Sequence, residues 1–274
     1  MTEGGPLTDG DPGTSLIELS AVTVVREGAT LLADVDWRVD RGEHWVVFGS
    51  NGSGKTTLME VVSSYLFPTR GEVTILGERL GRVDARKLRS RIGYVGPGPS
   101  ALVRQSLQAL EIVVTGRHAS FLDTRWHHYV EDDWARAATC LERLHASELA
   151  GRRFETLSEG ERKRVLIARS LMADPELLLL DEPGTALDLG ARERLVESLS
   201  ALARESGSLS SLLVTHHVEE IPPGYRYILM LASGKVIAAG PIEEVLTSHT
   251  LSDTFGMRLQ VARLGERWRA WSEQ

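Results

Sequence analysis

The chain has 274 residues, of which 42% are hydrophobic, enough for one large or two small domains with a buried core. Its formal net charge of −7 argues against a general nucleic-acid binder, because such proteins usually carry a basic excess. The single cysteine, Cys140, excludes an internal disulfide and favours a reducing cytosol. No apolar run approaches the roughly 18 residues that a membrane-spanning helix needs, so we expect no such helix.

The first 15 residues are rich in Gly, Pro and Asp and contain no apolar signal-peptide core, which predicts a disordered tail over residues 1–15. Alternating apolar residues predict strands at 17–25 and 45–48, and a third strand follows at 71–76. We expect these three strands to form an antiparallel sheet beside a nucleotide-binding core.

Residues 49–57 read GSNGSGKTT and match the phosphate-binding pattern G-x-x-x-x-G-K-[ST]. Glycines let the backbone adopt positive φ, so that successive N–H groups converge on phosphate oxygens. Lys55 can reach the β- and γ-phosphates, and the Thr56 hydroxyl can ligate Mg²⁺. A helix is predicted to begin in this loop and to run to about Phe67, before Pro68. The predicted nucleotide-binding residues are Gly49, Ser50, Asn51, Gly52, Ser53, Gly54, Lys55, Thr56 and Thr57.

From residue 98 to 155 the apolar residues follow a helical pattern. The cluster at 126–129, Trp-His-His-Tyr, has no cysteine or carboxylate at ligand spacing, so we expect packing or surface roles there. Residues 157–161 read LSEGE, in which Ser158 and Glu161 have the spacing of a capping box. This predicts a helix that runs to about Met172 and whose N-terminal N–H groups face outward, ready to bind an anion.

Four leucines at 177–180 predict a strand that is buried on both faces. Asp181 and Glu182 follow at its carboxyl end, which is where open α/β sheets bind ligands. Asp181 can hold Mg²⁺ through water, and Glu182 can polarise an attacking water. A second buried strand at 212–215 would bring His216 to the same edge. Near the C-terminus we expect a hairpin over 227–239, then a short helix and an irregular tail to Gln274.

Taken together, the motifs resemble those of the ATP-binding cassette (ABC) ATPases over residues 16–245. The resemblance implies an α/β fold: a RecA-like P-loop core with an antiparallel β subdomain and an inserted α-helical subdomain at about 98–156. Residues 246–274 would form a C-terminal extension. The implied site residues are Lys55, Glu182 and His216 for catalysis, Ser158, Glu159, Gly160 and Glu161 as a signature acting in trans, Asp188 in the D-loop, and Thr56 and Asp181 for the metal.

The resemblance also implies ATP and Mg²⁺ as cofactors and a head-to-tail homodimer or paired ABC subunit. Transmembrane permease subunits would be its partners at the cytoplasmic face of the membrane, and no nucleic acid is expected. Three further stretches are similar to the molybdate and iron-complex import ATPases. They are 42–45 (GEHW), 157–161 (LSEGE) and 215–220 (THHVEE).

The chain departs from the family pattern at two places. The stretch Val24, Val25 and Arg26 has no adenine-stacking aromatic, and Val25 and Arg26 are equal candidates to replace it. Pro97 stands where the family usually has a glutamine, and the nearest glutamine is Gln105. An ATPase that powers a transporter is the leading hypothesis. The alternatives are an ABC ATPase with a regulatory or repair role and no membrane partner, and a nucleotide-gated binding module that hydrolyses ATP slowly or not at all.

Overall fold

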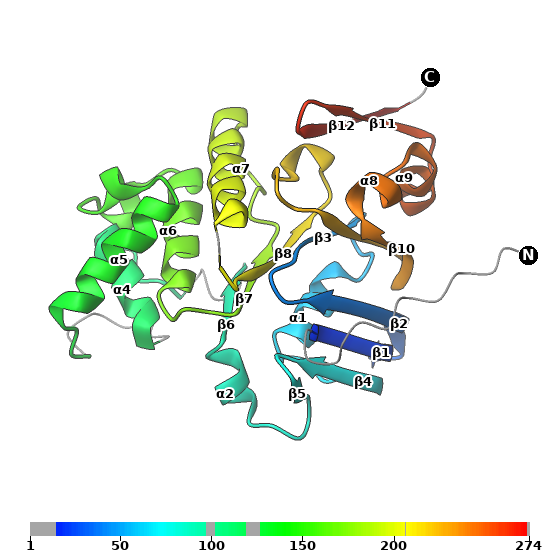
Figure 1. Cartoon of the computed structure of the whole chain (residues 1–274), viewed down its shortest axis with the longest axis horizontal. Coiled ribbons are helices and arrows are strands. Elements are labelled where there is room, and N and C mark those ends of the chain that lie inside the picture. The colour runs from blue at the N-terminus through cyan, green and yellow to red at the C-terminus, as the bar shows by residue number, and fades with distance from the viewer. Residues whose placement is uncertain (1–14, 97–101, 119–126, 206, 273–274) are drawn as a thin grey trace, which may run out of the picture.

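This computed structural model describes residues 15–96, 102–118, 127–205 and 207–272, which form three β-sheets and a set of helices (Figure 1). The strands are β1 (Ser15–Arg26), β2 (Ala29–Asp40), β3 (His44–Gly49), β4 (Arg70–Ile75), β5 (Glu78–Arg79), β6 (Ile92–Val95), β7 (Leu177–Asp181), β8 (Ser210–Thr215), β9 (Tyr227–Ala232), β10 (Lys235–Pro241), β11 (Leu259–Leu264) and β12 (Arg267–Ser272). The α-helices are α1 (Lys55–Val62), α2 (Ala85–Arg89), α4 (Ala109–Thr115), α5 (Glu131–Arg143), α6 (Glu159–Leu171), α7 (Leu189–Arg204), α8 (Ile242–Val245) and α9 (Ser248–Phe255). The 3₁₀ turns are η1 (Gly116–His118), η3 (Ser147–Leu149), η4 (Phe154–Thr156) and η5 (Val218–Glu220).

The central sheet has the strand order β10-β9-β3-β8-β7-β6. The pairs β9–β3, β3–β8, β8–β7 and β7–β6 are parallel, and only β10 runs antiparallel to its neighbour. The carboxyl ends of β3, β6, β7 and β8 therefore meet at one edge of the sheet. The ends of these strands and the loops that follow them carry the phosphate-loop residues, Asp181 with Glu182, and His216.

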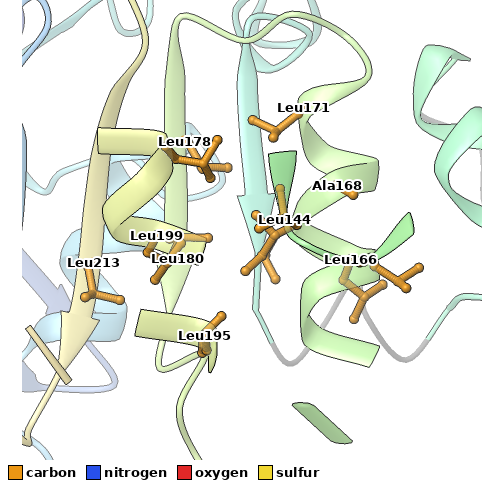
Figure 2. Packing of buried hydrophobic residues seen from close by; sticks show 14 of the residues in the cluster. Leu144, Leu166, Ala168, Leu171, Leu178, Leu180, Leu195, Leu199 and Leu213 are labelled. Carbon is orange, nitrogen blue, oxygen red and sulfur yellow. The ribbon is translucent and has the colours of Figure 1, made fainter. Parts of the chain in front are cut away.

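Strand β7 is buried along its whole length, as the leucine run predicts. Its side chains alternate between two hydrophobic clusters, because successive side chains of a strand point to opposite faces. Leu178 and Leu180 join the cluster that contains α5, α6 and α7, and Figure 2 shows them near Leu195 and Leu199 of α7. Leu177 and Leu179 join the cluster that contains α1 and the antiparallel sheet. Fully burying a leucine stabilises a fold by about 1.5–3 kcal/mol. The leucines of β7 therefore stabilise the packing of both hydrophobic clusters against the central sheet.

The antiparallel sheet has the order β2-β1-β4-β5. The strands predicted at 17–25 and 71–76 lie in it, but the placement of 45–48 in this sheet was wrong. Those residues belong to β3, which lies between β9 and β8 in the central sheet. An apolar run predicts a buried strand without specifying its sheet, and β3 is buried on both faces. The partner of β1 is β2, which the sequence analysis missed although Asp34 and Asp36 alternate with buried residues along it.

Helix α1 begins at Lys55 as predicted but ends at Val62, five residues before Phe67. The Ser63 hydroxyl donates to the carbonyl of Met59 (2.6 Å), and the backbone N–H of Tyr65 donates to the carbonyl of Glu60 (2.9 Å). These bonds close the last turn, so the chain leaves the helix well before Pro68.

Helices α4, α5 and α6 are grouped at one end of the molecule, and the antiparallel sheet lies toward the other end (Figure 1). The helices and 3₁₀ turns described between β6 and α6 lie within the segment predicted to be helical, except that η4 ends one residue beyond it, at Thr156. The predicted hairpin over 227–239 is confirmed as β9 and β10.

The short helix predicted after Pro241 is confirmed as α8, but the irregular tail predicted after it was wrong, because that segment contains α9 and the hairpin of β11 and β12. The partly buried Trp268 packs against the main cluster, whereas Trp271 is 52% exposed. Of the predicted N-terminal tail, residues 1–14 lie outside the described residues, and Ser15 is the first residue of β1.

Candidate functional site

The phosphate-loop sequence connects β3 to α1 at the carboxyl edge of the central sheet. Gly54 precedes the helix with φ 107°, a backbone conformation that side chains rarely adopt. A Cβ at this position would lie 2.9 Å from the carbonyl oxygen of Leu31 and 2.9 Å from the Leu32 side chain. Glycine is therefore required here both by conformation and by the close approach of β2.

Lys55 is the first residue of α1 and is only 4% exposed. Its Nζ donates hydrogen bonds to the carbonyl oxygens of Gly49 and Ser50, both at 2.9 Å, and lies 3.7 Å from Glu182 Oε1. Burial lowers the pKa of Lys55, and the carboxylates of Glu182 and Asp181 oppose that shift. The lysine thus lies between the phosphate loop and the acidic pair.

Asp181 ends β7 and is 5% exposed. Its Oδ2 accepts a hydrogen bond from the hydroxyl of Tyr94 on the neighbouring strand β6, at 3.2 Å. Burial raises the pKa of Asp181, while the Tyr94 hydrogen bond acts in the opposite direction. Burial likewise raises the pKa of Tyr94, so its hydroxyl keeps its proton and donates.

Glu182 has φ 48°, in the left-handed region that is costly for a residue with a side chain. Its backbone N–H donates to the carbonyl of Val214 on β8 (3.1 Å), which holds this turn against the neighbouring strand. Glu182 Oε1 lies 3.3 Å from Nδ1 of His216. Glu182 therefore approaches both Lys55 and His216 through the same oxygen.

Contacts of Thr215 and Glu220 connect the segment after β8 to the loop after β7. The Thr215 hydroxyl donates to Glu220 Oε2, and both residues are buried. A Cβ on Gly184, two residues after Glu182, would clash with the Glu220 carboxylate. Sequence reasoning assigned no role to Glu220, although it ends the 215–220 stretch, or to Tyr94, because their contacts with Thr215, Gly184 and Asp181 depend on the tertiary structure.

The predicted capping box at the start of α6 is confirmed. The N–H of Ser158 donates to Glu161 Oε2 (2.8 Å), and the N–H of Glu161 donates to the Ser158 hydroxyl (3.4 Å). Burial alone would raise the pKa of Glu161, but hydrogen bonds from Ser158 and Arg152 hold it below its ordinary value. Gly160 has a packing role within this chain, because a Cβ there would lie 2.7 Å from the Cβ of Ala191 on α7.

One open cleft of about 1980 Å³ brings several predicted residues together. The ones that line it are Asn51, Gly52, Gly54, Lys55, Thr56, Thr57, Glu159, Asp181 and Glu182. The others do not line it: Gly49, Ser50, Ser53, Ser158, Gly160, Glu161, Asp188 and His216. Asp188 instead caps α7 by accepting a hydrogen bond from the N–H of Ala191 (2.7 Å).

The structure describes the stretch that lacks an adenine-stacking aromatic, but it does not describe the position that lacks the glutamine. Val25 is 42% exposed, and neither it nor Arg26 lines the cleft, whereas Thr30 and Leu31 on the opposite strand do. Gln105 is exposed and donates to the carbonyl of Val103 (3.3 Å). Pro97 lies outside the described residues.

Two negative findings concern the part of the chain that the structure describes. Within it, no three His, Cys, Asp or Glu residues are grouped so that they could hold a metal ion by themselves. His127 stacks on His118 with ring centroids 4.8 Å apart, and Trp126 lies outside the described residues. No helix in the described ranges combines the length and the apolar character needed to cross a membrane.

Comparison with known proteins gives consistent matches. The family model described as ABC transporter matches residues 32–185. YlmA of Bacillus subtilis, an uncharacterized ABC transporter ATP-binding protein, is 43% identical over 90% of this chain and 93% of its own length. The ferric enterobactin transport ATP-binding protein of Escherichia coli is 29% identical over 85% of this chain and 84% of its own length. The iron-complex resemblance therefore has a counterpart among the relatives.

Among solved structures, the ATP-binding cassette MJ0796 is similar, in a dimeric post-hydrolysis state bound to ADP and Pi. It is 27% identical, with a TM-score of 0.69, over 82% of this chain and 98% of that structure. These matches agree with the fold predicted from the motifs, a P-loop core with an antiparallel sheet and added helices.

Proposed function

We propose that this chain closes head-to-tail on a second cassette around Mg-ATP. The chain belongs to the ABC transporter family and is an ATP-binding, ATP-hydrolysing subunit of a transporter. The second cassette is another copy or a paired ABC subunit. Support for a pair comes from the related cassette MJ0796, which is dimeric with ADP and Pi bound. The signature residues Ser158, Glu159, Gly160 and Glu161 would then complete the site of the opposite chain.

The single observation that carries the proposal is the position of Glu182 Oε1, 3.7 Å from Lys55 Nζ and 3.3 Å from His216 Nδ1. In our assignment Glu182 orients or deprotonates the attacking water, and His216 holds that carboxylate and contacts the γ-phosphate. Lys55 stabilises charge on the transferring phosphoryl group. The phosphate loop, Gly49 to Thr57, binds the phosphates through its N–H groups, and the outward-facing start of α6 supplies N–H groups to the partner's nucleotide.

The residues present fit a magnesium ion. Thr56 is an exposed hydroxyl in the cleft, and the buried carboxylate of Asp181 lines the same cleft. Hydroxyl and carboxylate oxygens are the ligands that Mg²⁺ prefers, with water between metal and protein where needed. When bound, Mg²⁺ neutralises charge on the β- and γ-phosphates. Thr56 and Asp181 are thus the proposed metal-binding pair.

We further propose permease subunits as membrane partners, with the chain at the cytoplasmic face of the membrane. The transporter names of the curated relatives favour this over a regulatory or repair role without a membrane partner. Residues 16–245 would form the ATPase domain, with the helical subdomain at about 98–156 and residues 246–274 as a C-terminal extension. Asp188 would act at the boundary between the two nucleotide sites of the dimer. We propose no nucleic-acid partner.

Replacing Glu182 tests the assignment. Glu182→Gln should lower the rate of ATP hydrolysis at least about a hundredfold, because an amide cannot accept the proton of the water. ATP affinity, measured by calorimetry, should be retained, since the phosphate loop is intact. Glu176→Gln is the matched control, because Glu176 precedes the same strand β7 at the opposite edge of the sheet. Turnover near the wild-type rate in Glu182→Gln would refute the assignment.

A further inference from the structure

Tyr94 places a hydroxyl beside the acidic pair of the site, at the end of a strand that the motifs do not cover. It belongs to β6, which pairs in parallel with β7, and lies opposite Leu179 in the register. Its side chain reaches toward the carboxyl edge, where its hydroxyl donates to Asp181 Oδ2 at 3.2 Å. Asp181 is 5% exposed, so water has little access to take over that hydrogen bond.

Gly96 provides the space that this hydroxyl occupies. A Cβ at Gly96 would lie 2.6 Å from the Tyr94 hydroxyl oxygen and 2.8 Å from the ring carbon that bears it. Both distances are shorter than a van der Waals contact, so any larger residue at position 96 would push the end of the Tyr94 side chain away from Asp181. The position of the hydroxyl therefore depends on the glycine two residues later, just after β6.

The Tyr94 ring has an aromatic neighbour. The ring of Tyr65, just after α1, lies 6.5 Å from that of Tyr94, and the Arg89 guanidinium lies 4.8 Å from the centre of the Tyr65 ring. Arg89 also donates to the carbonyl of Ser64 (3.2 Å). These contacts place the Tyr65 ring near the Tyr94 ring and connect it to α2 through Arg89.

We infer that Tyr94 is a positioning residue that fixes the orientation of the Asp181 carboxylate for magnesium binding in Mg-ATP. The inference rests on the proposed function, in which Asp181 serves the metal.

The test measures metal dependence rather than activity alone. The affinity of each variant for ATP is determined by calorimetry in excess EDTA and again over a magnesium series. Tyr94→Phe removes only the hydroxyl and keeps the ring. Its ATP affinity in EDTA should match the wild type, which shows that the site is folded. The magnesium concentration for half-maximal enhancement of ATP binding should rise roughly three- to tenfold, as expected for losing one hydrogen bond to a charged group.

Two further variants separate position from chemistry. Gly96→Ala keeps the hydroxyl but should displace it, and we expect a rise in the magnesium requirement in the same direction. Tyr65→Phe removes an exposed hydroxyl from the adjacent ring and should leave the magnesium requirement unchanged. Steady-state rates of ATP hydrolysis should agree with the binding data. The rate of Tyr94→Phe should be lower than that of the wild type at low magnesium and should approach it at high magnesium.

The outcomes distinguish the inference from the function it rests on. If the wild type gains ATP affinity with magnesium and Tyr94→Phe has the same magnesium requirement, the role of Tyr94 is refuted while the proposed function stands. If magnesium does not strengthen ATP binding even in the wild type, the metal assignment fails, and this inference fails with it.

Discussion

At the scale of single residues, Glu182 shows how backbone and side chain combine at this site. Its left-handed φ of 48° is held by the hydrogen bond from its N–H to Val214, and its carboxylate reaches Lys55 and His216. Strained backbone of this kind persists only where the surroundings determine it. The buried Glu220, fixed by Thr215 against Gly184, supplies part of those surroundings from the next loop.

A second residue-scale feature is the side chain that contacts the adenine base of the nucleotide. Leu31 lines the cleft, and its carbonyl approaches Gly54, whereas Val25 and Arg26 are exposed and do not line it. We predict that Leu31→Ala raises the Kd for ADP roughly three- to tenfold through lost apolar contact, and that Val25→Ala changes it less than about twofold. Calorimetric titration with ADP measures both. A larger loss in Arg26→Ala than in Leu31→Ala would instead favour a guanidinium stacked on the base.

Single residues were predictable from the sequence where a short motif carries them. Lys55, Asp181 and Glu182 belong to contiguous patterns, so their common location follows from the order of parallel strands. Tyr94 was not predictable in this way, because its role depends on the pairing of β6 with β7 and on the space left by Gly96. A tyrosine in an apolar strand is an ordinary core residue until the tertiary structure places its hydroxyl.

At the scale of elements, Glu176 connects three strands at the amino edge of the central sheet. It accepts hydrogen bonds from Arg91 Nε (2.6 Å), before β6, and from Arg41 Nη1 (2.7 Å), before β3. The hydrogen bond from Arg91, and next that from Arg41, holds the pKa of Glu176 below its ordinary value although partial burial acts in the opposite direction. A carboxylate with a lowered pKa stabilises the fold above its unfolded pKa and loses that effect as the pH falls through its folded pKa.

Glu176→Gln should therefore lower the free energy of unfolding by about 1 kcal/mol at pH 7, an amount that allows for solvent screening. The difference from wild type should shrink as the pH falls below the unfolded-state pKa, roughly 4.3, and should be lost once the pH is below the lowered folded-state pKa. Urea denaturation at pH 7 and at pH 3 measures it. Glu266→Gln is the control, because the ion pair of Glu266 with Arg204 is largely exposed. An equal loss at both pH values would show that the charge of Glu176 is not responsible.

The sequence predicted whether a segment is a helix or a strand more often than it predicted which strands pair with one another. The leucine run, the capped helix α6 and the hairpin of β9 with β10 were each specified by local pattern. The sheet to which β3 belongs was not, because an apolar run is equally compatible with either sheet. The hairpin of β11 with β12 was missed for a related reason. Its strands are only partly buried, and Arg267 holds it to the rest of the chain by pairing with Glu193 on α7 and donating to the carbonyl of Glu219.

At the scale of the whole molecule, the signature and the phosphate loop of one chain serve different sites in the proposed dimer. Ser158 and Gly160 do not line this chain's cleft, although Glu159 does. The capping box keeps the N-terminus of α6 formed in the absence of any partner. The sequence could predict this helix and its outward-facing end from Ser158 and Glu161, but not which chain supplies the phosphate it meets, since that depends on assembly.

The most direct test of the composite site is the mass of the Glu182→Gln variant in solution, measured by light scattering after size exclusion. With Mg-ATP it should elute at twice its 30.1 kDa chain mass, and without nucleotide as a monomer. Adding Ser158→Arg should abolish the dimer while calorimetry still detects ATP binding, because the phosphate loop is untouched. A double variant that dimerises with ATP as readily as Glu182→Gln would contradict a signature acting in trans.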